Sequence, residues 1–283
     1  MRSTNTAYLI FILLAANAIS WQAILGTKQK TARFAFLDIG QGDGTLIIGP
    51  RTTILYDDGP SGRRTVSEIA AVLPPYQHRI DLLVLSHSDK DHYGGTFEIL
   101  RRYQVGLILT NTVPAHDSGW QELLRAAAAE HVPTLMIRAG TTITTPTESI
   151  TVLNPPRDRF FASGRKKKPD FDNPNSVVLQ VKEQGPHLTR PMTLLLTGDI
   201  DAAVEHYLVQ HYQLASDYLL IPHHGSRFSS SAEFLRAVHP RLAVIQVGQH
   251  NRYGHPTVET LERIRQAGIP AWRTDTQGRL ITE

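Results

Sequence analysis

Short apolar runs recur along the chain, and most of them end in polar or glycine-rich residues. The first three runs, Arg33–Leu37, Thr45–Ile48 and Thr53–Tyr56, predict consecutive short strands joined by glycine-rich turns. Later runs of the same kind predict further strands at Asp81–Leu85, Val105–Leu109, Thr134–Ile137, Thr141–Thr145, Ile150–Leu153, Val177–Val181, Thr193–Leu196, Tyr218–Ile221, Leu242–Val247, Ala271–Thr274 and Arg279–Ile281.

Stretches with apolar residues at helical spacing lie between many of these strands. They predict helices at Arg64–Leu73, Thr96–Tyr103, Trp120–His131, Asp201–Tyr212, Phe234–Val238 and Thr257–Ala267. Strands come first and then alternate with helices, which predicts an α/β fold in which helices cover a mixed sheet. The early pattern returns after Asn175, so the chain has two halves of similar make-up.

The stretch Ala7–Leu25 contains no charged residue and is about long enough to cross a bilayer as a helix. It is either an uncleaved membrane anchor or a signal peptide with Ala16-Asn17-Ala18 as the cleavage site. We favour the anchor, because the apolar run continues past Ala18. The chain is therefore divided into a targeting segment at residues 1–30 and one folded domain at residues 31–283.

The composition of the 283 residues is that of an ordinary globular protein, with 41% hydrophobic and 19% charged residues. The absence of cysteine excludes both a disulfide framework and a thiolate zinc site. The net charge of +3 is compatible with nucleic acid as a partner but does not identify one.

The loop Ser86–Gly95 carries the clearest candidate chemistry, because His87, Asp89, Asp91 and His92 lie within six residues directly after an apolar strand. In extended chain His87 and Asp89 are two residues apart, so their side chains project to the same side. Asp91 and His92 are adjacent, so their side chains must diverge. The loop can therefore serve two metal ions, and imidazole with carboxylate suits Zn²⁺, Mn²⁺ or Fe²⁺. The alternative is a solvated polar loop.

Polar motifs follow several other strands as well, and open sheets concentrate ligand sites at strand ends. The strands in question end at Leu37, Leu85, Leu196, Ile221 and Val247. This pattern predicts one shared centre. Asp38, Gln41 and Asp43 follow the strand that ends at Leu37. They either contact metal ligands and orient them, without binding the metal themselves, or serve only as turn residues.

A long polar segment, Pro155–Asp172, includes the basic run Arg165, Lys166, Lys167 and Lys168. Such a run is most often a solvated loop. If the substrate is a polyanion, these four residues are the first candidates for contact with a nucleic-acid backbone.

Three motifs resemble the metallo-β-lactamase superfamily of binuclear metallohydrolases. They are His87-x-Asp89-x-Asp91-His92, Thr197-Gly198-Asp199 and Pro222-His223-His224-Gly225-Ser226. Together with Leu37–Asp43, Tyr253-Gly254-His255-Pro256 and Thr274-Asp275-x-x-Gly278, they resemble the C-terminal domain of ComEC-type DNA-uptake proteins. The resemblance spans about residues 33–283 and implies an αββα four-layer sandwich with the site at one edge of its two sheets.

The resemblance implies a ligand set for two divalent cations, zinc or manganese: His87, Asp89, Asp91, His92, Asp199 and His224. Asp199 is expected to bridge the ions, and His223 to face the substrate, although the roles of His223 and His224 could be exchanged. Asp89 replaces the superfamily's usual histidine, as is typical of ComEC-type proteins. The separate third-motif histidine has no match, and Asn175 is the nearest polar group.

The resemblance further implies hydrolysis of a phosphodiester by a metal-bound hydroxide. Asp91 and either His223 or His255 are expected to take part in catalysis, the histidine as donor or general acid. The alternative for His255 is a packing or helix-capping role.

The first functional hypothesis is a nuclease that acts on DNA, single-stranded DNA included, and that is either membrane-anchored by a single pass or exported in a bacterium. Alternatives are hydrolysis of a cell-wall phosphodiester, a thioester or a lactam, and a non-catalytic module of a DNA-uptake assembly. ComEC-type proteins carry a multi-helix channel before this domain, so this chain is either a detached hydrolase domain or one subunit of a split system with a channel-forming partner.

Overall fold

The structure is a computed structural model that describes residues 8, 10–18, 31–111, 118–158, 160–162, 172–184 and 190–282. Within these residues the chain forms two seven-stranded sheets. The strands of the first sheet, in spatial order, are β14 (Leu280–Ile281), β1 (Arg33–Phe36), β2 (Thr45–Ile48), β3 (Thr53–Tyr56), β4 (Arg79–Leu85), β5 (Gln104–Thr110) and β6 (Thr134–Met136).

The second sheet has the same layout as the first. Its strands, in spatial order, are β13 (Ala271–Arg273), β12 (Leu242–Ile245), β11 (Tyr218–Leu220), β10 (Thr193–Leu196), β9 (Val178–Glu183), β8 (Glu148–Asn154) and β7 (Thr142–Thr144). In each sheet three antiparallel pairings join four strands before the parallel pairings begin, at β3 in the first sheet and at β10 in the second. The two similar halves expected from the sequence are thus two similar sheets.

Strand β1 shows how side-chain alternation fixes the layers. Phe34 and Phe36 point into the core between the two sheets, while Ala35 and the following Leu37 point to the opposite face. Successive residues of a strand face opposite sides, so a strand that is apolar at every position must be covered on both faces.

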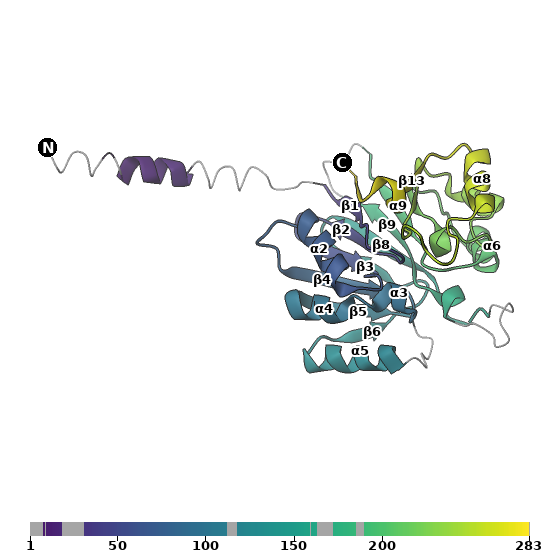
Figure 1. Cartoon of the computed structure of the whole chain (residues 1–283), viewed down its shortest axis with the longest axis horizontal. Coiled ribbons are helices and arrows are strands. Elements are labelled where there is room, and N and C mark those ends of the chain that lie inside the picture. Colours follow the sequence, from purple (N-terminus) through teal and green to yellow (C-terminus); the bar gives the residue numbers. More distant parts are fainter. Residues whose placement is uncertain are drawn as a thin grey trace.

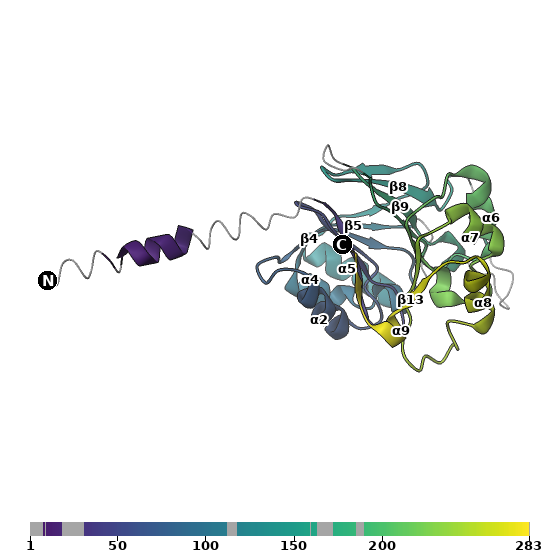
Figure 2. The same cartoon turned by 90° about the horizontal axis from the view of Figure 1, so that it is seen from above.

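Helices cover the outer face of each sheet. The first sheet carries α2 (Gly62–Val72), α4 (Thr96–Arg102) and α5 (Ser118–Ala129), and the second carries α6 (Ala202–His211), α7 (Ala232–Val238) and α8 (Val258–Gln266). Figures 1 and 2 show the two groups of helices on opposite sides of the paired sheets. The α/β four-layer prediction is confirmed.

One-turn helices occur where the sequence suggested only loops or turns. They are α3 (Lys90–Tyr93), η1 (Asn173–Asn175), η2 (Pro222–Gly225) and α9 (Thr274–Gln277). Two of them, α3 and η2, follow strand ends and carry candidate ligands, so they set the directions of those side chains.

The N-terminal stretch Ala7–Leu25 is described only in part. Residues 8 and 10–18 are helical and several of their apolar side chains are exposed, whereas the remainder lies outside the described residues. Among the helices that the structure describes, none is both long enough and apolar enough to span a bilayer.

Candidate metal centre

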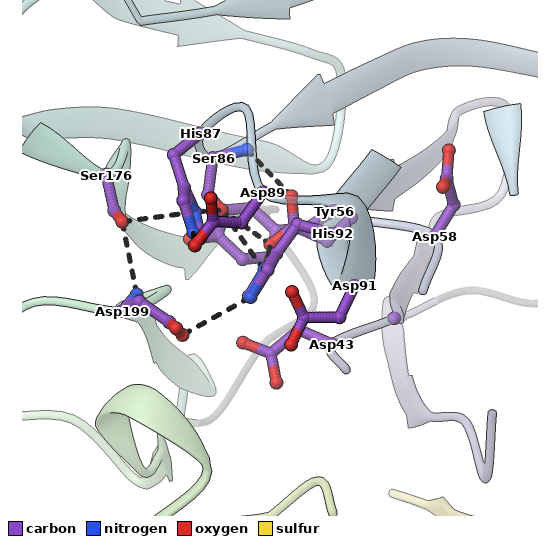
Figure 3. A network of polar contacts seen from close by, with 12 residues as sticks. Asp43, Tyr56, Asp58, Ser86, His87, Asp89, Asp91, His92, Ser176 and Asp199 are labelled. Atoms are coloured by element: carbon purple, nitrogen blue, oxygen red, sulfur yellow. Dashed lines mark hydrogen bonds and ion pairs between the residues drawn. The ribbon is translucent and has the colours of Figure 1, made fainter. Parts of the chain in front are cut away.

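The candidate centre begins in the loop that joins β4 to α4. His87 is fully buried after β4, and its Nε2 lies 3.6 Å from Oδ2 of Asp89. Asp89 has extended backbone and precedes α3, whose first turn carries Asp91 and His92. The rings of His87 and His92 lie with their centroids 4.1 Å apart. The four side chains that the sequence singled out therefore come from one short loop and lie side by side (Figure 3).

A buried carboxylate behind this loop orients it. Asp57 directly follows β3, and its Oδ2 accepts a hydrogen bond of 2.8 Å from Nδ1 of His92. The same carboxylate accepts hydrogen bonds from the backbone nitrogen and hydroxyl of Ser86, both of 2.7 Å. With Nδ1 engaged, Nε2 of His92 is left to face the centre, which is how outer carboxylates usually orient a metal-binding histidine.

The sequence analysis did not assign a role to Asp57. The available signal was its position at the end of an apolar strand, which it shares with the other site loops. The neighbouring Asp58 is equally buried but serves a different purpose, since it accepts hydrogen bonds from the backbone nitrogen of Gly95 and the hydroxyl of Thr96. The side chain of Asp58 thus fixes the start of α4, whereas its backbone nitrogen donates to the carbonyl oxygen of His92.

The second sheet supplies the other half of the cluster. Asp199 follows β10, and its Oδ1 lies 3.3 Å from Nε2 of His92. Its Oδ2 lies 3.4 Å from Nε2 of His223. Nε2 of His224 lies 3.5 Å from Oδ2 of Asp91 and 3.7 Å from Oδ1 of Asp199. Asp199 is therefore the carboxylate at which side chains from both sheets meet.

The two adjacent histidines after β11 have unusual backbone geometry. His223 and His224 have φ values of 52° and 53°, in the left-handed region that costs a non-glycine residue on the order of 1–3 kcal/mol. The turn separates their side chains: His224 is buried, whereas the side chain of His223 is 31% exposed. The two side chains therefore have different access to solvent, and their roles as metal ligand and substrate-facing group stay predictions.

Close backbone approaches at two glycines hold the site loops together. A Cβ on Gly42 would lie 2.1 Å from the carbonyl oxygen of Asp91, and one on Gly225 would lie 2.6 Å from Cβ of Pro256. Both glycines also have positive φ, of 131° and 85°. A side chain at either position would push one loop of the centre away from its neighbour.

Several ligand atoms of the cluster are buried without a hydrogen bond. Among the described residues these include Nε2 of His87, His92 and His224, together with Oδ1 of Asp199. An unsatisfied buried polar atom costs about 1–3 kcal/mol, and more when charged. Ligand atoms of His87, His92 and Asp199 lie within 4.8 Å of one another, as do those of Asp91, His92 and His224. This donor set of imidazole and carboxylate fits divalent metal ions such as Zn²⁺ or Mn²⁺.

The electrostatics of the cluster favour cations. Burial by itself raises the pKa of Asp199, but the neighbouring histidines hold it well below its usual value. Burial lowers the pKa of His92 and of His224, yet the carboxylates around them, Asp199 foremost, raise both well above 6.5. Without a metal, protons on these histidines balance the carboxylates, and a binding cation must displace them.

The residues expected to orient ligands are placed in different surroundings. Asp43 is fully buried, with Oδ1 lying 3.2 Å from Nδ1 of His224. Oε1 of Gln41 accepts a hydrogen bond from the backbone nitrogen of Gly248, and Asp38 forms a 2.6 Å ion pair with Arg64. Of these three side chains, Asp43 alone contacts a candidate ligand.

Asn175 and Asn173 occupy the turn of η1, and they point in different directions. The side chain of Asn175 forms hydrogen bonds with both backbone groups of Phe161, whereas Nδ2 of Asn173 lies 3.3 Å from Oδ2 of Asp199. The asparagine next to the cluster is therefore Asn173, which the sequence analysis had not selected.

His255 lies beside the centre, on the loop after β12. Its ring centroid is 5.8 Å from that of His223 and 5.9 Å from that of Tyr253. Burial, together with the charges of His223 and His224, lowers the pKa of His255 to about 4, so the ring is neutral at pH 7. The basic run of Arg165 to Lys168 lies outside the described residues.

No family model matches the sequence. The chain is 31% identical over 271 residues to competence protein ComA of Neisseria gonorrhoeae, which is 95% of this chain and 34% of that protein. It is 27% identical over 260 residues to ComE operon protein 3 of Bacillus subtilis, which is 86% of this chain and 32% of that protein. The chain thus spans about a third of the length of these curated relatives.

Solved structures with a similar fold are distant in sequence. CmlA, a diiron β-hydroxylase from Streptomyces venezuelae, superposes with a TM-score of 0.59 at 15% identity over 90% of this chain and 54% of that one. Zn²⁺-bound PqqB from Methylobacterium extorquens gives 0.56 at 12% identity, over 86% and 87% of the two chains. YhfI of Bacillus subtilis, a metallo-β-lactamase fold protein, gives 0.55 at 10% identity, over 89% and 99%. The chain accordingly has the metallo-β-lactamase fold and resembles, over most of its length, competence proteins of the ComA and ComEC type.

Proposed function

We propose that this protein is a metal-dependent phosphodiesterase that cleaves DNA at the centre between the two sheets. The observation that carries the proposal is the set of buried ligand atoms without hydrogen bonds, contributed by both sheets around Asp199. A packed structural core would not retain so many unsatisfied polar atoms in contact with one another. The similarity to competence proteins supports DNA as the substrate.

The residues divide naturally between two cation sites. His87 and Asp89 would hold one ion and Asp91 and His224 the other, with Asp199 shared between them and His92 within 4.8 Å of ligand atoms from both groups. Two divalent ions bring four positive charges, and Asp89, Asp91 and Asp199 return three. The resulting positive centre suits a phosphodiester anion. When bound, the ions would supply the activation of a water molecule and neutralise charge that develops on phosphate oxygens.

The protein's own groups orient the substrate and handle protons. The side chain of His223 is partly exposed beside Asp199, and burial lowers its pKa, so the ring is available as a neutral proton acceptor or donor. A neutral His255 donates a hydrogen bond to a phosphate oxygen more readily than it acts as a charged acid. Asp57 and the backbone carbonyl oxygen of Gln246 hydrogen-bond to Nδ1 of His92 and of His224, which keeps both rings turned toward the centre.

The test is cleavage of a labelled single-stranded oligonucleotide by the full chain with added Mn²⁺ or Zn²⁺. The control carries Asp91→Ala and His92→Ala together. Cleavage that requires metal and disappears in the control supports the proposal. Metal binding without cleavage of DNA contradicts it, and small phosphodiesters and lactams are then the substrates to assay.

We also propose that the N-terminal segment anchors the protein in a bacterial membrane, where a channel-forming partner would deliver DNA to it. The uncharged stretch Ala7–Leu25 supports the anchor. After expression in a bacterium, an anchored chain stays with the membranes during alkaline extraction and keeps its full mass. A chain shortened at Ala18 and released from the membranes contradicts the anchor and identifies a signal peptide.

A further inference from the structure

A hollow of about 400 Å³ opens beside the candidate centre. Its walls include Asp91, a candidate ligand, and three residues with chemistry of their own: Lys90, Arg252 and Tyr253. Lys90 belongs to the loop after β4, and the other two belong to the loop after β12. The hollow therefore lies where loops of both sheets meet, as the centre does, and its volume is within the range of small-molecule sites.

The loop after β12 is held in a defined shape by one side chain. Oδ1 of Asn251 accepts hydrogen bonds from the backbone nitrogens of Tyr253 and His255, of 3.2 Å and 3.0 Å. Nδ2 of Asn251 donates to the carbonyl oxygens of Gly248 and His255. Such a loop keeps Tyr253 in position before any ligand arrives, which lowers the entropy cost of binding.

Tyr253 offers an aromatic surface next to positive charge. It remains 51% exposed, and the guanidinium of Arg252 lies 5.0 Å from its ring centroid. Arg252 also donates a 2.9 Å hydrogen bond to the Tyr253 hydroxyl. An aromatic ring beside a cation is the usual platform for a nucleotide in a single strand, where the base stacks and the cation contacts phosphate.

A series of ring contacts connects this platform with the centre. The ring of Tyr253 contacts that of His255, the ring of His255 contacts that of His223, and the centroid of His223 is 6.3 Å from that of His224. A base stacked on Tyr253 would thus place the neighbouring phosphate toward His223 and Asp91.

A second hollow, of about 540 Å³, is a weaker candidate although it is lined by more arginines. There Arg79 pairs with Asp81 at 2.7 Å, and Arg102 pairs with Glu98. It lies at the start of β4 and β5, at the opposite ends of these strands from the candidate ligands. Lys90, by contrast, makes no ion pair with any residue that the structure describes.

We propose that the hollow beside Asp91 binds one nucleotide of a single-stranded nucleic acid next to the phosphate at the centre. The base takes the place of the Arg252 guanidinium over the Tyr253 ring, on the face away from His255, and Arg252 and Lys90 contact the backbone. This subsite rests on the proposed function, since the strand that it binds is the proposed substrate. Its test does not depend on that function, because binding can be measured on metal-free protein that cannot cleave.

The experiment measures fluorescence anisotropy of a labelled oligothymidylate with metal-free full-length protein. Tyr253→Ala should weaken binding by about 5- to 100-fold, and Tyr253→Phe, which keeps the ring, should stay within about threefold of wild type. Arg252→Ala should lower the log–log salt slope by about 0.7, the value for one lost phosphate contact. Arg101→Ala, an exposed arginine of the second hollow, is the matched control and should bind like wild type.

Unchanged binding by Tyr253→Ala, or an equal loss in Arg101→Ala, overturns the proposal. The proposal is also overturned if Tyr253→Ala loses as much affinity for duplex DNA as for the single strand, because the bases of a duplex cannot stack on the ring. Hydrolysis of bis(p-nitrophenyl) phosphate by metal-loaded wild-type protein tests the proposed function separately. If that hydrolysis fails while Tyr253→Ala still weakens binding, the subsite stands and the phosphodiesterase does not; the reverse pattern leaves the phosphodiesterase without this subsite.

Discussion

The two sheets of the molecule share one layout but contribute to the centre in different ways. The first sheet supplies four candidate ligands from a single loop, with a buried carboxylate, Asp57, behind them. The second sheet supplies Asp199 from one loop and the His223–His224 pair from another, and the pair adopts left-handed backbone. The first contribution depends on local spacing, and the second on how separate loops are packed together.

This difference predicts which single-residue substitutions in the centre should weaken metal binding most. A ligand in the first loop is fixed by its neighbours in sequence and by Asp57. Asp199 is held instead by groups from other loops: its carboxylate accepts a hydrogen bond from Asn173 and lies beside His92 and His223. The second sheet should therefore show the larger losses when one residue is removed.

The largest effect is expected for Asp199→Ala. Because this carboxylate is shared by both proposed cation sites, its loss should weaken Zn²⁺ binding by more than about 100-fold. That exceeds the usual effect of removing a residue that only orients a metal ligand. Isothermal titration calorimetry measures it. Asp201→Ala is the control: it removes the cap of α6 at a cost of about 1 kcal/mol but should leave metal affinity intact. Equal affinities for all three proteins would contradict the shared role.

The adjacent histidines should separate metal binding from catalysis. His224→Ala should lose Zn²⁺ affinity by about as much as Asp199→Ala, since its buried Nε2 faces Asp91 and Asp199. His223→Ala should bind metal within about tenfold of wild type yet lose about 10²- to 10⁴-fold in kcat, the range for removal of a proton-transfer group. If instead His223→Ala loses Zn²⁺ affinity and His224→Ala loses mainly kcat, the roles of the two histidines are exchanged.

Two neighbouring buried carboxylates give a finer comparison within the first sheet. Asp57→Asn should lower metal affinity about 10- to 100-fold, because it weakens the hydrogen bond that orients His92. Asp58→Asn should leave metal affinity unchanged and lower the free energy of unfolding by about 1–3 kcal/mol, through its bonds to Gly95 and Thr96. Calorimetry and denaturant unfolding on both variants distinguish these outcomes.

The smallest effect concerns pH. The pKa values of His92 and His224 are raised in the metal-free fold, so protons there stabilise it below pH 6.5 and this contribution is lost as pH rises through the raised values. A metal ion displaces these protons, so its affinity should rise by about tenfold per pH unit for each proton released. The increase in Tm on adding Zn²⁺ should therefore grow with pH. A shift that is constant between pH 6 and 8 would contradict this coupling.

Much of the fold follows from the sequence because successive side chains of a strand always point to opposite faces of the sheet. Phe34, Ala35 and Phe36 show that β1 is covered on both faces, and the same pattern in later strands predicts two helix-covered layers. The ligand loop was equally accessible, because its four side chains are close together in sequence. Their placement as metal ligands stays a prediction until an ion is observed.

The supporting residues could not be chosen from sequence for physical reasons. Asp57 and Asp58 are both fully buried acids, and it is Asp57 that has a φ of 55° and whose side chain contacts the ring of His92. Asn173 and Asn175 stand two apart in a one-turn helix, and that turn brings Asn173, not Asn175, to Asp199. In each pair residue type and spacing are nearly the same, so only the backbone conformation separates the roles.

The most direct test of the centre between the sheets is a count of bound ions by native mass spectrometry of the full chain with Zn²⁺ or Mn²⁺. The account predicts two ions in wild type, one in His87→Ala, one in His224→Ala and at most one, weakly held, in Asp199→Ala. A single ion in wild type that persists in either histidine variant would contradict a two-ion centre shared by both sheets.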